Sequence, residues 1–135
     1  MRLDIWKIVL LKNILLLAVI QICLKKKFQV VDARSKNRFL GLEKEPRPNV
    51  RNGSIKNSSC LPFGELINPE DKTFIKKNLI KEKFKNIGVN NENNVVFSCG
   101  SGITASVLGL AYYIINDRYL PAIYDGSWAE YGKLK

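Results

Sequence analysis

The chain has 135 residues, with 22 Lys and Arg, 12 Asp and Glu and no His, and carries a formal net charge of +10. Because histidine is absent, the sequence excludes Ser-His-Asp and Cys-His catalysis, an imidazole general base and a histidine metal site. Hydrophobic residues make up 46% of the chain and charged residues 25%, which is typical of a globular protein with one modest domain.

The three cysteines, Cys23, Cys60 and Cys99, are odd in number and include no Cys-x-x-Cys spacing. This pattern favours neither a disulfide framework nor a four-thiolate zinc site, so we expect a reducing compartment and no metal or other cofactor. The positive charge is not gathered in an arginine-rich helix or a basic-aromatic repeat, and we therefore predict no nucleic-acid partner. Its expected roles are solubility and the attraction of small anions.

The first segment, Ile5 to Leu24, is rich in Ile, Leu and Val but is interrupted by polar and charged residues. A membrane span needs about 20 predominantly apolar residues, so no span is predicted. The segment also continues into Lys25-Lys26-Lys27 without the small-residue cleavage site of a secretory signal. We interpret residues 1–27 as an apolar helix packed on the domain of residues 28–135 or on a neighbour. The alternative is a targeting or membrane-associated segment.

Three short apolar runs bounded by polar or turn-forming residues predict strands: residues 28–31, 94–98 and 121–124. Between the first two runs, the polar stretch 34–57 contains several Gly and Pro residues and is expected to be a long loop. Loops of such length inside a compact domain are usually functional.

Two helices are predicted. The first begins at Asn68-Pro69, which suit the N-cap and first helical positions, and continues to about Asn86 with its lysines in solvent. The second, residues 103–115, is apolar nearly all round and is therefore expected to be buried. Because strands and helices alternate, the sequence predicts an α/β fold, an open parallel sheet flanked by helices.

The chemistry is concentrated in Cys99-Gly100-Ser101-Gly102-Ile103-Thr104, between a predicted strand and the buried helix. Open α/β sheets bind ligands at this carboxyl end of a strand. Two glycines let the backbone curl so that successive N–H groups point at one spot, where they and the helix N-terminus stabilise an anion. We therefore expect a lowered pKa for the Cys99 thiol, which would act as a nucleophile without histidine. The alternative is a buried structural cysteine beside a tight turn.

A cysteine-dependent phosphatase is a rival interpretation of a thiolate in an anion-binding loop. That chemistry needs a guanidinium that closes the loop and holds the phosphoryl oxygens in two hydrogen bonds. The loop is followed by Ala105 and Ser106, and the next arginine is Arg118, beyond the helix. Phosphoryl transfer is therefore disfavoured.

Five motifs together resemble the catalytic C-terminal domain of the rhodanese family over about residues 28–132. They are Val31-Asp32-Ala33-Arg34, Arg38-Phe39-Leu40-Gly41, Glu45-Pro46-Arg47, Cys99-Gly100-Ser101-Gly102-Ile103-Thr104 and Tyr124-Asp125-Gly126-Ser127-Trp128. The Gly-Ser pair inside the cysteine loop is similar to 3-mercaptopyruvate sulfurtransferases, whereas thiosulfate sulfurtransferases typically have Arg-Lys there.

The resemblance implies a rhodanese-like fold and a persulfide relay. Cys99 would take a sulfur from 3-mercaptopyruvate, or alternatively thiosulfate, and pass it to cyanide or a thiol acceptor such as thioredoxin. Arg38 and Arg47 match the family's substrate-binding arginines, and a guanidinium suits the planar carboxylate of a 2-oxo acid. Ser101 would contact the leaving group, and the backbone at Gly100, Gly102, Ile103 and Thr104 would complete the anion cradle.

The remaining motif residues have structural roles in this interpretation. Asp32 and Arg34 would fix the strand end and the loop, and Trp128 would close an edge of the core. Cys60 lies outside the five motifs and is a first departure from the family pattern. It would be a packing residue, or alternatively a resolving or regulatory thiol.

The sequence departs from the family pattern in two further ways. Where the family usually has Gly-His-Ile-Pro-Gly, this chain has Gly53-Ser54-Ile55-Lys56-Asn57, which predicts a less ordered loop. Relatives of this subtype usually carry an N-terminal rhodanese domain that forms part of the pocket wall, which residues 1–27 do not resemble. A catalytically weak module that binds partners or carries persulfide therefore stays an alternative to the enzyme. The basic, Leu- and Ile-rich first segment leaves a mitochondrial or a cytoplasmic location open.

Overall fold

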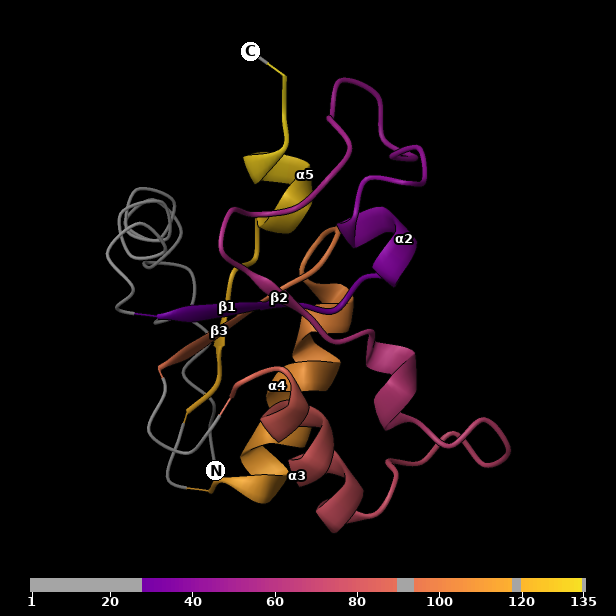
Figure 1. Cartoon of the computed structure of the whole chain (residues 1–135), viewed down its shortest axis with the longest axis vertical. Coiled ribbons are helices and arrows are strands. Elements are labelled where there is room, and N and C mark those ends of the chain that lie inside the picture. The colour runs from indigo at the N-terminus through magenta and orange to yellow at the C-terminus, as the bar shows by residue number, and fades with distance from the viewer. Residues whose placement is uncertain (1–27, 90–93, 118–119, 135) are drawn as a thin grey trace.

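The computed structural model describes residues 28–89, 94–117 and 120–134 (Figure 1). The apolar helix predicted within residues 1–27 lies outside these ranges. Among the described helices, none combines the length and the apolar character that crossing a membrane requires.

The centre of the fold is a parallel sheet of β1 (Gln29–Asp32), β2 (Ser59–Cys60), β3 (Val95–Ser98) and β4 (Ala122–Ile123). The strand order is β2-β1-β3-β4, and each neighbouring pair is parallel. This topology confirms the predicted α/β fold with an open parallel sheet. Because β1 and β3 are central, their carboxyl ends lie side by side, with Asp32 opposite Ser98.

The larger core lies between one face of the sheet and two helices, α3 (Lys77–Asn86) and α4 (Ile103–Ile115), which lie together in Figure 1. Its centre is a set of edge-to-face and tilted aromatic contacts among Phe84, Phe97 and Tyr112, with ring centroids 5.2–6.1 Å apart. The two helices therefore pack against β3, the strand that leads directly into Cys99.

A smaller core covers the other face of the sheet. Val30 and Val96, opposite each other in the register, pack there with Ile55, Tyr124 and Trp128. Trp128 belongs to the short helix α5 (Ser127–Tyr131) and is fully buried, as predicted for a residue that closes the core. Two layers of side chains thus fix the sheet that positions the cysteine loop.

The prediction of one helix from Asn68 to Asn86 is wrong in its first half, because α3 begins only at Lys77. The Asn68 side chain accepts a hydrogen bond from the N–H of Glu70, and its own N–H donates to the carbonyl of Thr73 at 2.8 Å. Asn68 therefore closes a turn instead of capping a helix, and Ile67 and Phe74 pair as an antiparallel bridge. This turn places Phe74 against the larger core.

The prediction that helix 103–115 is buried all round is also wrong, although its bounds are confirmed by α4. Ile103, Leu110 and Ile114 are 77%, 52% and 37% exposed. The sheet and α3 cover one side of α4, and within the described residues no further layer packs on its outer side.

The polar stretch 34–57 is not wholly a loop. It contains α2 (Lys36–Phe39), whose N-cap Ser35 accepts a hydrogen bond from the N–H of Arg38. After β2, the short 3-10 helix η1 (Phe63–Leu66) leads to the Asn68 turn.

Candidate functional site

Cys99 follows β3 directly, and the loop that begins there is tied to the start of α5. The N–H of Cys99 donates to the Ser127 hydroxyl at 3.0 Å, and the Cys99 carbonyl accepts from the N–H of Trp128 at 2.9 Å. The Gly100 carbonyl accepts from the N–H of Ala129 at 3.0 Å. The segment at 127–129 therefore fixes the backbone on both sides of the thiol.

The loop curls around the sulfur as the two glycines predicted. The N–H groups of Ser101 and Gly102 donate to the Cys99 Sγ at 3.4 and 3.0 Å. Gly102 has a φ of +87°, and a Cβ there would lie 3.0 Å from the carbonyl oxygen of Asp125. Both the left-handed backbone and the close approach require glycine at this position.

The pKa of the Cys99 thiol lies below that of an ordinary cysteine. Burial acts in the opposite direction, but hydrogen bonds from the Thr104 side chain and from the backbone of Ser101, Ala105 and Thr104 outweigh it. Cys60 provides the contrast, because burial raises its pKa to about 11. Of the two described cysteines, Cys99 is the one poised to act as a thiolate.

Cys99 lines a pocket of about 440 Å³ together with Arg38 and Arg47. The two guanidiniums lie against the loop, because a Cβ on Gly100 would be 3.0 Å from Arg47 Nη1 and 3.4 Å from Arg38 Nη2. The Nε of Arg38 is buried and has no hydrogen-bond partner among the described residues. A pocket with a thiolate and two guanidiniums suits a small anion that carries an electrophilic atom.

A buried carboxylate joins the two arginines. Arg38 Nη2 donates to both carboxylate oxygens of Glu45 at 2.9 and 3.0 Å, and Arg47 Nη1 donates to Oε1 at 3.0 Å. The Glu45 side chain is 2% exposed, and burial alone would raise its pKa. The hydrogen bonds from Arg38 and Arg47 reverse this and hold the pKa below that of an ordinary glutamate.

Sequence reasoning gave Glu45 no role in the site. The available signal was an acid two residues before one arginine and seven residues after another, inside a loop that is expected to be functional. Only the folded loop shows that one carboxylate reaches both guanidiniums.

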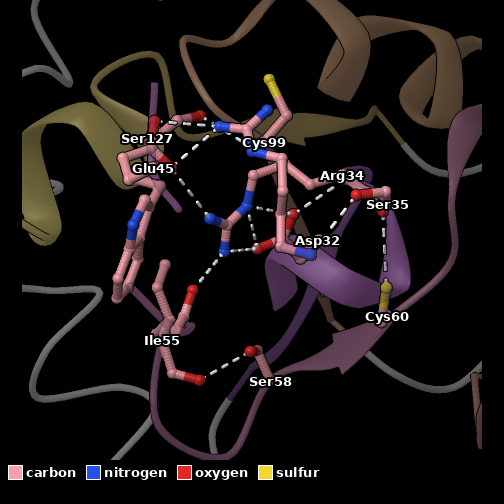
Figure 2. Close-up of polar contacts among 12 residues, drawn as sticks. Asp32, Arg34, Ser35, Glu45, Ile55, Ser58, Cys60, Cys99 and Ser127 are labelled. Atoms are coloured by element: carbon pink, nitrogen blue, oxygen red, sulfur yellow. Dashed lines mark hydrogen bonds and ion pairs between the residues drawn. The ribbon is translucent and has the colours of Figure 1, made fainter. Parts of the chain in front are cut away.

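The second ion pair at the site connects the end of β1 to the loop, as predicted for Asp32 and Arg34. The Arg34 Nε and Nη2 donate to the buried Asp32 carboxylate at 2.7–3.1 Å, and Nη2 also donates to the Gly53 carbonyl at 2.7 Å. Figure 2 shows this guanidinium between Asp32 and Glu45, whose Oε2 lies 3.7 Å from Nη1. It also stacks on Trp128, with Cζ 4.8 Å from the ring centroid. Arg34 thus joins four segments around the pocket.

Of the eight predicted site residues, seven line the pocket: Cys99, Arg38, Arg47, Gly100, Ser101, Ile103 and Thr104. The eighth, Gly102, contributes its N–H to the sulfur. Sequence reasoning missed four wall residues: Ala33 and Arg34, which follow β1, Ser35, which caps α2, and Phe63 of η1. Within the described ranges, no three His, Cys, Asp or Glu side chains are grouped to hold a metal ion.

The sequence profile of the rhodanese-like domain matches residues 19–134. Over 106 residues the chain is 38% identical to a mouse 3-mercaptopyruvate sulfurtransferase, which covers 78% of this chain and 35% of the mouse protein. It is 36% identical over 104 residues to a mitochondrial thiosulfate/3-mercaptopyruvate sulfurtransferase of Arabidopsis thaliana, covering 77% of this chain and 27% of that protein. The chain therefore spans about a third of the length of these curated relatives.

Solved structures agree with the sequence matches. The Tum1 protein of Saccharomyces cerevisiae has a TM-score of 0.71 and 30% identity, covering 82% of this chain and 40% of that chain. The 3-mercaptopyruvate sulfurtransferase SseA of Escherichia coli has a TM-score of 0.67 and 29% identity, covering 82% and 39%.

Proposed function

Because the chain belongs to the rhodanese-like domain family, we propose that it is a sulfurtransferase that moves sulfur from 3-mercaptopyruvate through a Cys99 persulfide to a thiol or cyanide. Thiosulfate is the alternative donor. The observation that carries this proposal is the placement of a thiolate-stabilising loop and two guanidiniums on one pocket. Relatives named as 3-mercaptopyruvate and thiosulfate sulfurtransferases support it.

The first half-reaction uses the thiolate as the nucleophile. Arg38 and Arg47 would hold the donor's carboxylate, and Ser101, which lines the same pocket, would contact the leaving group through its hydroxyl. The Cys99 thiolate attacks the donor sulfur, an S–S bond forms, and the C–S bond breaks with its electron pair on the carbon. The resulting enolate takes the proton that the donor's thiol carried, so pyruvate leaves and the persulfide on Cys99 stays as an anion. The loop N–H groups that stabilise the thiolate also stabilise the persulfide anion.

The second half-reaction regenerates the thiolate. An acceptor thiolate attacks the outer sulfur of the persulfide, forms a new S–S bond, and displaces Cys99 with the electron pair of the old bond. With cyanide, the same displacement yields thiocyanate. No oxidant or reductant beyond donor and acceptor is needed.

Intact-mass spectrometry after incubation with 3-mercaptopyruvate tests this proposal. We expect one added sulfur atom, its loss on treatment with a thiol, and one pyruvate released per sulfur. Cys60→Ser is the matched control and should gain the sulfur as the wild type does, because the pKa of that thiol is raised. If Cys99→Ser gains the sulfur equally well, the assignment is wrong.

A second candidate, a persulfide carrier that depends on a partner for turnover, is favoured by the exposed apolar side chains at the pocket. Phe63 is 40% exposed and Ile103 is 77% exposed. Such a carrier would form the persulfide slowly alone and faster when the N-terminal domain of a relative is added in trans. Comparison of pyruvate release under the two conditions separates the candidates.

Domain organisation, acceptor and location complete the proposal. Residues 28–135 would form the catalytic domain, and residues 1–27 a separate N-terminal segment. The acceptor would be a small thiol or a protein thiol such as thioredoxin, and the location mitochondrial or cytoplasmic. One similar plant protein is named as mitochondrial, which supports the first of these locations.

A further inference from the structure

The charged side chains around the pocket form a closed set. Three arginines, Arg34, Arg38 and Arg47, line it, and two buried carboxylates, Asp32 and Glu45, hold them. The Asp32 carboxylate accepts hydrogen bonds from Arg34, whose guanidinium also stacks on the Trp128 ring. The pair of cations left for a ligand, Arg38 and Arg47, therefore shares one carboxylate.

This arrangement fixes the charge that a ligand meets. With both carboxylates ionised, the set has a surplus of one positive charge, and the Cys99 thiolate brings the pocket to neutrality. A donor with one negative charge leaves the occupied pocket at one negative charge, whereas a dianion leaves it at two. Each further charge is costly in a partly desolvated site, so the pocket discriminates by ligand charge.

We propose that Glu45 is a specificity-determining residue that holds Arg38 and Arg47 side by side and, by neutralising one of them, selects a monoanionic sulfur donor over a dianionic one. This inference rests on the proposed function and deepens it. The favoured class is a thiol of a 2-oxo acid, and the disfavoured class is a sulfur donor of the thiosulfate type. Glu45 acts through the two arginines and is not a catalytic residue.

Glu45→Gln separates charge selection from simple positioning. The substitution keeps the side-chain shape and removes one negative charge beside the two guanidiniums. If the substitution loosens the guanidiniums, the binding of both classes of anion weakens, because both use the same hydrogen-bond donors. The loss of charge, in contrast, favours the dianion, so the ratio of the two affinities isolates it.

Equilibrium binding to Cys99→Ser protein provides the assay, because no sulfur can be transferred there. Pyruvate serves as the monoanion and sulfate as the dianion, at constant ionic strength. The ¹⁵N shifts of the Ser101 and Gly102 amides report binding at the loop itself. We expect Glu45→Gln to raise the sulfate-to-pyruvate affinity ratio about tenfold, the order expected for one unit charge a few ångströms from the ligand.

Glu65→Gln is the matched control. It changes the net charge of the chain equally, at a residue paired with Lys83 and Lys36 instead of the pocket arginines. The affinity ratio should stay unchanged in this variant. A similar rise in both variants would overturn the proposal, since it would reflect net charge alone. An equal loss of both anions in Glu45→Gln would also overturn it, since Glu45 would then only position the arginines.

Arg47→Gln keeps the inference testable if circular dichroism shows that Glu45→Gln does not fold. Arg47 is 35% exposed, and its removal should lower the same affinity ratio, because the dianion loses more than the monoanion. A ratio that stays constant in this variant overturns charge selection. If the wild-type protein forms no persulfide but the variants change the affinity ratio as expected, only the proposed function is wrong. The two failures are therefore distinguishable.

Discussion

Replacing Gly100 by alanine tests whether the two guanidiniums bind the donor. The new Cβ would lie 3.0 Å from Arg47 Nη1 and 3.4 Å from Arg38 Nη2, inside ordinary van der Waals contact. The Arg47 guanidinium must therefore withdraw by a few tenths of an ångström, which lengthens and weakens its hydrogen bond to the donor carboxylate. Such a charged hydrogen bond contributes about 1.5–3 kcal/mol, so its partial loss should lower kcat/KM for 3-mercaptopyruvate roughly 3- to 10-fold.

The same substitution should leave stability nearly unchanged. Gly100 is not among the glycines with positive φ, and the atoms that the Cβ meets are the ends of flexible side chains. The free energy of unfolding in urea should change by less than about 1 kcal/mol. Gly102→Ala is the matched contrast: its φ of +87° and the Asp125 carbonyl 3.0 Å away should lower stability by about 1–2 kcal/mol. A Gly100→Ala protein with unchanged kcat/KM would refute donor binding by guanidiniums over the loop.

Three further predictions concern the framework of the site. Arg34→Met leaves the Asp32 carboxylate buried without its partner and should lower the free energy of unfolding in urea by about 3–5 kcal/mol; a loss below about 1 kcal/mol contradicts this. Ser127→Ala removes the acceptor of the Cys99 N–H and should lower stability by about 1–3 kcal/mol in the same assay, whereas wild-type stability would assign that N–H another acceptor. Alkylation by iodoacetamide, followed by peptide mapping across pH, should proceed at Cys99 near neutrality and at Cys60 only toward pH 11, because the first pKa is lowered and the second raised; coincident profiles would refute the anion cradle.

The central strands β1 and β3 and the helix α4 were predictable because their signals are local. Val30-Val31 and Val95-Val96-Phe97 are apolar runs of strand length, and the Gly102 position marks the start of a long apolar helix. The turn at Asn68 was not predictable in the same way. Asn-Pro suits both a helix start and a turn, and the choice depends on whether Phe74 can reach the core, which is a tertiary contact.

The exposed face of α4 illustrates a second limit. Apolar residues at Leu110 and Ile114 indicate a surface that something covers, but composition does not say whether the covering layer belongs to the same domain. The described residues supply no such covering layer. The sequence therefore indicated more burial of α4 than the structure shows.

One part of the site was predictable from a short segment of sequence, and another part was not. The Cys99 loop could be predicted because one short segment contains the thiol, the glycines and the helix start. The ion-pair system could not, because Glu45 lies seven residues from Arg38 in a stretch without periodicity, and its partners are chosen by loop geometry. Electrostatics that depend on three segments need the folded structure.

Other side chains provide the restraints that a histidine provides in the family pattern. The segment Gly53–Asn57 lacks the histidine and the proline that are usual in the rhodanese family, and a less ordered loop was therefore expected there. The structure supplies other restraints: the Gly53 carbonyl accepts from Arg34 at 2.7 Å, and Ile55 is 2% exposed in the smaller core. Because Arg34 also stacks on Trp128, whose N–H holds the Cys99 carbonyl, a guanidinium connects this segment to the cysteine loop. The chain therefore keeps its thiolate loop anchored by an arginine and an apolar contact, and neither the anchoring nor the stabilisation of the thiolate requires an imidazole.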